Sequence, residues 1–186
     1  LYYSIHHAFF SVASVITTTG YGTVDFNLWP MFSKFVLVMI MFIGACAGST
    51  GGGMKVSRIL IYVKTVKKEI EGMIHQKSIK VLKMDGKTVE HSVIRNANVY
   101  LVSYLMIMAV SLLIVALDNF DFETSFTAVA ATFNNIGPGL GKVGPTGNFS
   151  EFSNLSKLVL TFDMLAGRLE IFPMLLLFSR ATWSRK

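Results

Sequence analysis

The chain has 186 residues, of which 52% are hydrophobic and 15% are charged, and its mean hydropathy is +0.54. Soluble domains usually carry about 25% charged residues, so this composition indicates an integral membrane protein. A single cysteine, Cys46, excludes a disulfide framework and a metal site built from several cysteines.

The net charge of +6 is concentrated in one polar region, residues 55–95. That region holds ten Lys or Arg against four acidic residues, so it carries the whole excess. The positive-inside rule therefore predicts that it faces the cytoplasm. A nucleic-acid-binding patch is the alternative, and the bilayer-length apolar segments on both sides argue against it. The chain starts within an apolar segment with no signal-peptide pattern, and we expect further sequence before Leu1.

The first expected element is a short apolar helix over residues 5–17. At 1.5 Å per residue it covers about 20 Å, less than the ~30 Å hydrocarbon core of a bilayer. It leads into the sequence TTTGYG at residues 17–22. Glycine accepts unusual backbone angles and leaves neighbouring carbonyl oxygens accessible, which suits a loop that replaces the hydration shell of K⁺. For so short a motif, an ordinary turn is the alternative.

The next apolar segment, residues 35–54, is uncharged and long enough to span a bilayer. Residues 44–53 within it contain five glycines, each of which costs a helix about 1 kcal/mol relative to alanine. We therefore expect the helix to break at membrane depth, where protein or a water-filled cavity must receive the backbone polar groups. Gly48 and Gly53 have the spacing of a phosphate-binding P-loop. Met54 occupies its lysine position, however, and no strand is expected before it, so this interpretation is less favoured.

Two elements are expected in and after the basic region. Residues 78–93 predict a small hairpin around the turn Asp85-Gly86. A two-stranded hairpin is marginal alone, so it should lean on the rest of the protein or on a partner. Residues 96–117 form a second uncharged stretch and predict a transmembrane helix that runs outward from the cytoplasm.

The layout of the first part of the chain then recurs. Residues 122–133 predict another short apolar helix, residues 134–141 form a second glycine-containing loop, and residues 158–178 form a final span. Gly137 follows Gly20 by 117 positions. Because two independent units share this layout, ion-coordinating loops become the favoured interpretation of both.

The final span contains Asp163, Arg168 and Glu170. Charges inside a membrane segment are costly, and they mark either a permeation pathway or an internal ion pair. Arg168 near a cation pathway would raise an electrostatic barrier. The alternative is that Arg168 pairs with a carboxylate and only holds helices together.

Residues 17–22, 44–54, 134–141 and the GRLEIF stretch at 167–172 resemble, in kind and order, the Trk/Ktr/HKT superfamily of K⁺ transporters. The resemblance implies an all-α integral membrane fold of repeated helix–re-entrant pore loop–helix units, with a glycine-broken inner helix and a small cytosolic β-hairpin. Four such units surround one pore in the family. Here residues 1–63 would be the third unit without its first helix, residues 64–94 a basic cytosolic linker with the hairpin, and residues 95–186 the complete fourth unit.

The resemblance also implies roles for individual residues. The expected selectivity filter consists of Thr18, Thr19, Gly20, Tyr21, Asn135, Ile136, Gly137 and Pro138. Within it, K⁺ would bind at Thr18, Thr19, Asn135 and Ile136. The expected intramembrane gate consists of Gly44, Gly48, Ser49, Thr50, Gly51, Gly52 and Gly53. Arg168 would be a pore charge beneath the filter. The second loop departs from the first by carrying Ile136 and Pro138 in place of Thr19 and Tyr21, which bears on how symmetric and selective the pore is.

The function implied is K⁺ uptake through a multi-pass protein of the bacterial inner membrane, without catalysis and without a cofactor. The implied partners are K⁺, membrane lipid, the N-terminal half of the same subunit, a second copy in a homodimer and a cytosolic nucleotide-binding regulatory subunit, with no nucleic acid. A Na⁺-permeating or Na⁺-coupled member of the superfamily, including a symporter, is the nearest alternative. A membrane-anchored nucleotide-binding protein and a non-conducting scaffold that binds anionic lipid are alternatives of other classes.

Overall fold

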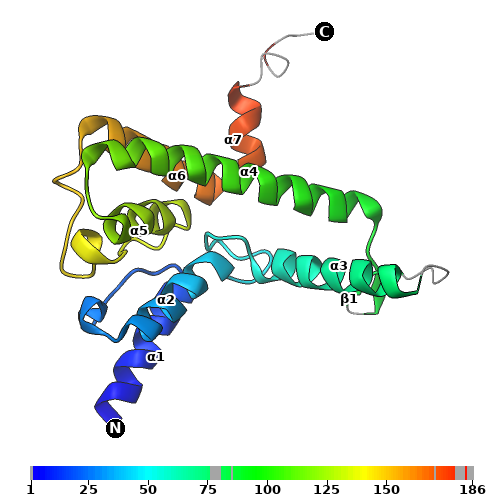
Figure 1. Ribbon diagram of the computed structural model, residues 1–186, viewed down its shortest axis with the longest axis horizontal. Helices are drawn as coiled ribbons and strands as arrows, with labels where there is room; N and C mark the ends of the chain where they lie inside the picture. The colour runs from blue at the N-terminus through cyan, green and yellow to red at the C-terminus, as the bar shows by residue number, and fades with distance from the viewer. Residues whose placement is uncertain (1, 76–80, 85, 170, 179–182, 184–186) are drawn as a thin grey trace.

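The computed structural model describes residues 2–75, 81–84, 86–169, 171–178 and 183. Its elements are α1 (Tyr2–Ile16), η1 (Phe26–Leu28), α2 (Met31–Ile43), α3 (Val56–Ile74), β1 (Lys83–Met84), β2 (Lys87–Thr88), α4 (His91–Val115), η2 (Ala116–Asp118), α5 (Phe122–Phe133), η3 (Gly141–Val143), α6 (Asn154–Leu169) and α7 (Ile171–Phe178). Helices α3 and α4 run side by side, and α5 and α6 pack on the other half of α4 (Figure 1). Helices α1 and α2 form a second pair, and α2 contacts α5.

Helix α1 confirms the expected short apolar helix, although it begins earlier than predicted, at Tyr2. Its 15 residues cover about 22 Å, which is too short to cross a bilayer core. The helix ends at Ile16 because Thr18 adopts a left-handed conformation with φ of 55°. The carbonyl of Ala13 accepts from both the main-chain N–H of Thr17 at 3.0 Å and the Thr17 hydroxyl at 2.6 Å.

The predicted break in the second apolar segment is confirmed. Helix α2 begins directly after Pro30, whose fixed φ suits a helix start, and it ends after 13 residues at Ile43. Gly44 follows with φ of 69°, and helix resumes only at Val56. Residues 44–55 between the two helices therefore form an irregular connection inside an apolar stretch.

The hairpin is confirmed around its turn but is shorter than predicted, because residues 91–93 belong to helix α4. Strand β1 pairs antiparallel with β2, with Lys83 opposite Thr88 and Met84 opposite Lys87. Residues 78–80 and Asp85 of the prediction lie outside the described residues. The hairpin contacts α3, where Lys64 donates to the main-chain oxygen of Lys83 at 2.8 Å. A two-stranded hairpin needs such support because it is only marginally stable alone.

Helix α4 confirms the predicted transmembrane helix. Among the described residues, the stretch His91–Asp118 is the one helix long and apolar enough to cross a membrane. One face of α4 is buried in the protein at Tyr100, Tyr104, Ser111 and Val115. The remaining faces expose large apolar side chains suited to lipid contact: Val99, Val102, Leu105, Met106, Val110 and Leu113.

Helix α5 has the bounds predicted for the second short helix. Asp121 caps its N-terminus by accepting from the main-chain N–H of Thr124 at 3.0 Å. Every residue from Thr127 to Asn134 is buried, because α4, α6 and α2 all pack against α5. Helix α5 is therefore the most enclosed element of the described structure.

The stretch predicted as the final span, residues 158–178, is helical throughout its described part. Helix α6 reaches Leu169 and α7 begins at Ile171, with Glu170 between them outside the described residues, and α7 points away from α4 (Figure 1). Pro173 favours this change of direction between α6 and α7. Proline has no N–H for the carbonyl four residues earlier, which belongs to Leu169, and its ring clashes with that carbonyl in a continuous helix.

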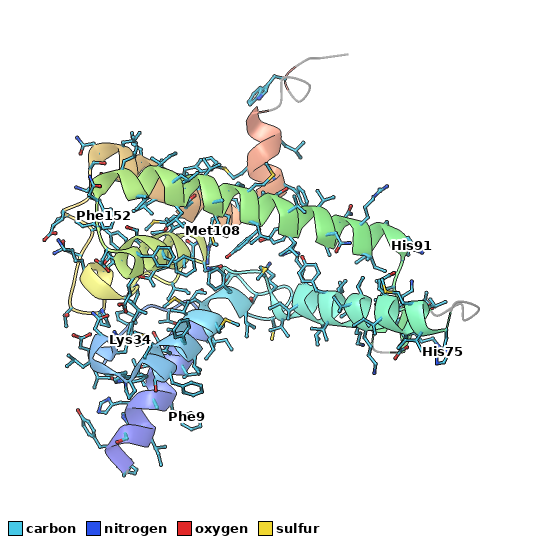
Figure 2. All side chains as sticks on the ribbon, in the orientation of Figure 1. Phe9, Lys34, His75, His91, Met108 and Phe152 are labelled. Atoms are coloured by element: carbon cyan, nitrogen blue, oxygen red, sulfur yellow. The ribbon has the colours of Figure 1, made fainter. Side chains whose placement is uncertain are left out.

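Side chains fill the interior between these helices in three apolar clusters (Figure 2). One cluster combines the two halves of the chain, since Val15, Leu37 and Met41 from α1 and α2 pack with Ile136 and Leu140 from the second glycine-containing loop. The two other clusters join α4 to α5, α6 and α7. The second glycine-containing loop therefore packs against the helices of the first unit.

Candidate functional site

The two loops that follow α1 and α5 have residues of positive φ at matching positions. We call residues 17–22 the first glycine loop and residues 134–141 the second glycine loop. Thr18 and Asn135, which are 117 positions apart, have φ of 55° and 56°. Gly20 and Gly137, at the same offset, have φ of 79° and 105°. Left-handed residues thus occur at matching positions, and the repeat found in the sequence is also a repeat of local structure.

The hydrogen bonds that close the two helices repeat in the same way. In the first unit, the N–H of Thr19 donates to Ser14 at 2.9 Å. In the second, the N–H of Ile136 donates to Ala131 at 2.8 Å, again with the offset of 117. The Ser14 hydroxyl also donates to the main-chain oxygen of Tyr21 at 2.7 Å, which folds the first loop back onto its helix. Each glycine loop is therefore anchored to the C-terminal end of its own short helix.

The two glycine loops lie against each other. A Cβ placed on Gly20 would overlap the main-chain oxygen of Ile136 and lie 3.3 Å from the ring of Pro138. The Ile136 side chain points away into the shared apolar cluster and is 3% exposed. The main chain of Ile136, rather than its side chain, therefore faces the first loop, and only glycine fits at position 20.

The connection between α2 and α3 is folded tightly on itself. We call residues 44–54 the glycine segment. Main-chain hydrogen bonds tie it to both helix ends, from Met54 N–H to Phe42 at 3.2 Å and from Val56 N–H to Ala45 at 3.1 Å. Gly44 lies against Gly53, where an added Cβ on Gly53 would stand 2.9 Å from the Gly44 Cα. The segment is thus a compact loop with paired backbone groups.

The glycine segment lies directly against both glycine loops. A Cβ on Gly52 would overlap the main-chain oxygen of Asn134 and stand 3.2 Å from the Cβ of Asn135. A Cβ on Gly51 would stand 3.4 Å from the Thr18 hydroxyl oxygen. Three segments that are far apart in the sequence therefore converge on one place, and glycine permits their backbones to approach.

The C-terminal end of α6 completes this convergence. Arg168 donates from Nη1 to the main-chain oxygen of Thr50 in the glycine segment. One residue earlier, a Cβ on Gly167 would overlap the main-chain oxygen of Phe133, so α6 approaches the end of α5 closely. The Asn135 side chain donates from Nδ2 to the Met164 carbonyl at 2.9 Å. Helix α6 thus touches both the second glycine loop and the glycine segment.

Not every expected site residue takes part in this convergence. Tyr21 is 73% exposed, and only its main-chain oxygen has a hydrogen bond to α1. An added Cβ on Gly48 or on Gly137 would meet nothing within 4 Å. The partner of Arg168 recorded here is a carbonyl group, and Glu170, which the sequence offered as a carboxylate partner, lies outside the described residues.

Sequence reasoning missed two residues of this site, Asn134 and Tyr104. Asn134 is fully buried at the end of α5, and its Oδ1 accepts from the Tyr104 hydroxyl of α4 at 2.8 Å. The signal for Asn134 was present, since an amide directly after an apolar helix is a common helix end. Tyr104 gave no comparable signal, because a tyrosine in an apolar span is indistinguishable from a core residue in the sequence alone.

The chemistry that this site offers consists mainly of main-chain oxygens. The buried polar side chains nearest to it are amides and hydroxyls, and the charged side chain of Arg168 contacts it. The P-loop interpretation of the glycine segment finds no support in its setting, since α2 precedes the segment and the described residues 2–43 contain no strand.

Comparisons with known proteins place these features in context. A family model described as "TrkH: Cation transport protein" matches residues 1–185. The chain is 37% identical over 180 residues to the Trk system potassium uptake protein TrkH of Escherichia coli K12, covering 97% of this chain and 37% of that protein. It is 34% identical over 183 residues to TrkG of the same organism, covering 98% of this chain and 37% of that protein.

A crystal structure of the potassium transporter TrkH from Vibrio parahaemolyticus matches with a TM-score of 0.86 and 37% identity. The match covers 98% of this chain and 39% of that one. The chain therefore spans little more than a third of the length of the curated relatives that it matches.

Proposed function

The chain belongs to the TrkH family of cation transport proteins, and we propose that it forms part of a potassium-conducting pore in a bacterial inner membrane. Proteins of this family are transporters and not enzymes, and the proposal includes no catalytic step. K⁺ would pass between main-chain oxygens of the two glycine loops and then past the glycine segment.

The observation that carries the proposal is the matched left-handed backbone of the two glycine loops at Thr18 and Gly20 and at Asn135 and Gly137. Ordinary helix ends contain one left-handed residue, whereas each of these loops starts with two that are separated by one residue, and Gly141 adds a third at the end of the second loop. Such alternation lets successive carbonyl oxygens turn toward one side, as coordination of a dehydrated cation requires. Two loops that share this geometry and contact each other are well suited to line one axis.

We propose the remaining filter and gate assignments on the same basis. The filter would comprise both glycine loops, with K⁺ at the main-chain oxygens of Thr18, Thr19, Asn135 and Ile136. The glycine segment would be the gate, because it lies against both loops and is joined to Arg168 of α6. Arg168 would add a positive charge beside the path of a cation.

The organisation of the whole protein is part of the proposal. Residues 1–63 and 95–186 would be two of four pore units, with the remaining units supplied by another part of the same subunit. Residues 64–94 would face the cytoplasm, where the lysines of α3 and the hairpin offer a docking surface to a nucleotide-binding regulatory subunit. A homodimer is the expected assembly, and Na⁺ permeation or coupling is the alternative mode of transport.

The first test of this function is the substitution Gly20→Ala in the full-length protein, expressed in K⁺-starved cells. An alanine there combines a left-handed backbone angle with an overlap against the Ile136 oxygen. Left-handed strain alone costs ~1–2 kcal/mol, so we expect Rb⁺ uptake per transporter to fall about tenfold or more.

Two control variants separate the causes. Gly137→Ala adds strain without an overlap, since its surroundings are open, and should reduce uptake less. Gly72→Ala lies in α3 at an ordinary backbone angle and in open space, and should leave uptake unchanged. Unimpaired uptake in Gly20→Ala at normal abundance would contradict the assignment of the glycine loops as a filter.

The second test addresses the gate. Removal of residues 49–52 takes away the Thr50 carbonyl that Arg168 contacts and the glycines that lie against both loops. If the glycine segment obstructs the path, Rb⁺ uptake should rise and should no longer depend on the regulatory subunit. Uptake that stays the same or falls, with normal protein abundance, would count against the gate.

A further inference from the structure

Asn134 occupies a junction between three parts of the molecule. It is 0% exposed and ends α5, where its Nδ2 donates to the Ala130 carbonyl at 2.8 Å. Its Oδ1 accepts from the Tyr104 hydroxyl of α4, also at 2.8 Å. The amide side chain is therefore held from both ends, and its orientation is fixed by one helix of its own unit and by one residue of α4.

The same asparagine meets the glycine segment. Its main-chain oxygen stands where a Cβ on Gly52 would lie, and its Oδ1 is 3.5 Å from the Cβ position of Gly53. No side chain separates Asn134 from either glycine. The position of Asn134 therefore determines how closely the glycine segment approaches the second glycine loop.

Aromatic packing holds the ring of Tyr104 in place independently of its hydroxyl group. Its ring is 2% exposed and lies 4.6 Å from Phe133, 6.2 Å from Tyr100 and 6.5 Å from Phe42, measured between ring centroids. A phenylalanine would keep these aromatic contacts. The hydroxyl is thus the part of Tyr104 that acts on Asn134, and it can be removed alone.

The corresponding position in the first unit has no such tie. Thr17 stands 117 residues before Asn134, is exposed, and uses its hydroxyl within its own loop, on Ala13 and on Thr19. Its contacts remain local, whereas those of Asn134 reach α4. The bond from Tyr104 is therefore a specific feature of the second unit and not a general requirement for ending these short helices.

We propose that Tyr104 is a positioning residue of the pore: its hydroxyl orients Asn134, and Asn134 seats the glycine segment beneath the second glycine loop. The transport consequence rests on the proposed function, whereas the seating of the glycine segment does not. Without the hydroxyl, Asn134 Oδ1 loses its donor in a buried setting, and the glycine segment separates more readily from the loop.

The test is the substitution Tyr104→Phe in the full-length protein in detergent or lipid, read out in two ways. Hydrogen exchange of the amides in residues 44–55 should become about fivefold faster, because one buried hydrogen bond contributes ~1 kcal/mol. In proteoliposomes without a regulatory subunit, the rate of Rb⁺ uptake per folded protein should rise by a similar factor. The exchange measurement tests the positioning role even if the protein transports no Rb⁺. A failure of the proposed transport function is therefore distinguishable from a failure of the positioning role.

Two further variants distinguish the proposed positioning role of Tyr104 from a general loss of stability. Ser111→Ala removes another buried hydroxyl donor from α4, the one that donates to Asp163 at 2.8 Å, without touching the loops. It should leave exchange in residues 44–55 as in the wild type. The double variant Tyr104→Phe/Asn134→Leu replaces both partners by apolar groups, so no buried polar group is left unpaired and any loss of protein abundance in Tyr104→Phe should be recovered. Hydrogen exchange in residues 44–55 should stay as fast as in Tyr104→Phe.

The proposal is overturned if Tyr104→Phe exchanges at the wild-type rate in residues 44–55. It is equally overturned if Ser111→Ala accelerates that segment as much, or if the double variant restores wild-type exchange together with abundance. Each of these results would make Tyr104 a packing residue only.

Discussion

Strained backbone is concentrated at the residues proposed to handle the ion. Four non-glycine residues in the described structure have positive φ, and three of them, Thr18, Lys55 and Asn135, lie in the glycine loops or next to the glycine segment. A β-branched residue such as Thr18 seldom adopts this conformation, and its cost of order 1–3 kcal/mol persists only where surroundings enforce it. Here the hydrogen bond from Thr18 N–H to Val15 at 3.1 Å and the contact with Gly51 do so. Such strain is typical of a functional site.

Arg168 allows a prediction at this scale. Arg168→Gln removes both the charge and the geometry of the bond to the Thr50 carbonyl. A unit charge near the path acts on a cation with ~1 kcal/mol at 4 Å in water, so the rate of Rb⁺ uptake per transporter should rise about fivefold. The measurement is Rb⁺ uptake normalised to transporter abundance in membranes.

Arg168→Lys is the matched control, because lysine keeps the charge but not the planar guanidinium group. If the charge sets the rate, the lysine variant transports as the wild type does. If the bond to Thr50 sets it, the lysine variant resembles the glutamine variant. Reduced abundance with an unchanged rate per transporter in both variants would show that Arg168 only joins helices.

Several site residues were predictable from the sequence because the information is local. Glycine at position 20 and the repeat at an offset of 117 are visible without coordinates, and the convergence of the loops follows from the repeat. The pair Tyr104 and Asn134 was not predictable, because their contact depends on how α4 crosses α5. A side-chain pair 30 residues apart leaves no periodic pattern.

At the scale of elements, the predicted helix ends were correct where helix propensity and capping depend on residues close by in the sequence. The helix breaks at Gly44 and the bounds of α5 follow from glycine content and from Asp121 at the N-cap. The change of direction between α6 and α7 was not predicted although Pro173 is just as local. Membrane helices often tolerate proline, and composition alone favoured one continuous span.

The cap of α5 gives a prediction with a defined pH dependence. Hydrogen bonds from the hydroxyl and the main-chain N–H of Thr124 lower the pKa of Asp121 below its usual value. A lowered pKa in the folded state means that the cap stabilises fully above the unfolded pKa of about 3.9 and is lost as pH falls through the folded pKa. Asp121→Ala should therefore lower the free energy of unfolding by about 1 kcal/mol at pH 7 and by progressively less below pH 4.

Thermal unfolding of the purified protein at a series of pH values checks this prediction. Asp121→Asn is the control, because asparagine is also a good N-cap but does not titrate. Its difference from Asp121→Ala should stay constant over the acid range. A difference between wild type and Asp121→Ala that grows as pH falls would contradict the sign worked out above.

For the molecule as a whole, the central feature is that two units far apart in the sequence are joined beside the glycine loops. Lys34 of α2 (Figure 2) pairs with Glu123 of α5 at 3.2 Å, with 16% and 38% of the two side chains exposed. Asn27 and Gly141 exchange two hydrogen bonds, from Asn27 Nδ2 at 3.1 Å and from Gly141 N–H at 3.0 Å. The Lys34–Glu123 pair joins α2 to the first turn of α5. The two bonds between Asn27 and Gly141 hold the end of the second glycine loop beside η1, the element that follows the first loop, and so limit the distance between the loops.

Asn27→Ala tests whether that distance matters for transport. Loss of both bonds to Gly141 should lower the free energy of unfolding by about 2 kcal/mol, since each contributes ~1 kcal/mol. The preference for Rb⁺ over Na⁺, measured by competition in the uptake assay, should decrease as well, because the oxygens of the two loops are no longer held at a fixed separation. Asn148→Ala is the control, since its Oδ1 serves only a local turn by accepting from Ser150 N–H at 2.9 Å. If Asn27→Ala unfolds more easily yet keeps the wild-type preference, the contact joins the two units without setting the spacing of the loops, and selectivity must then arise within each loop separately.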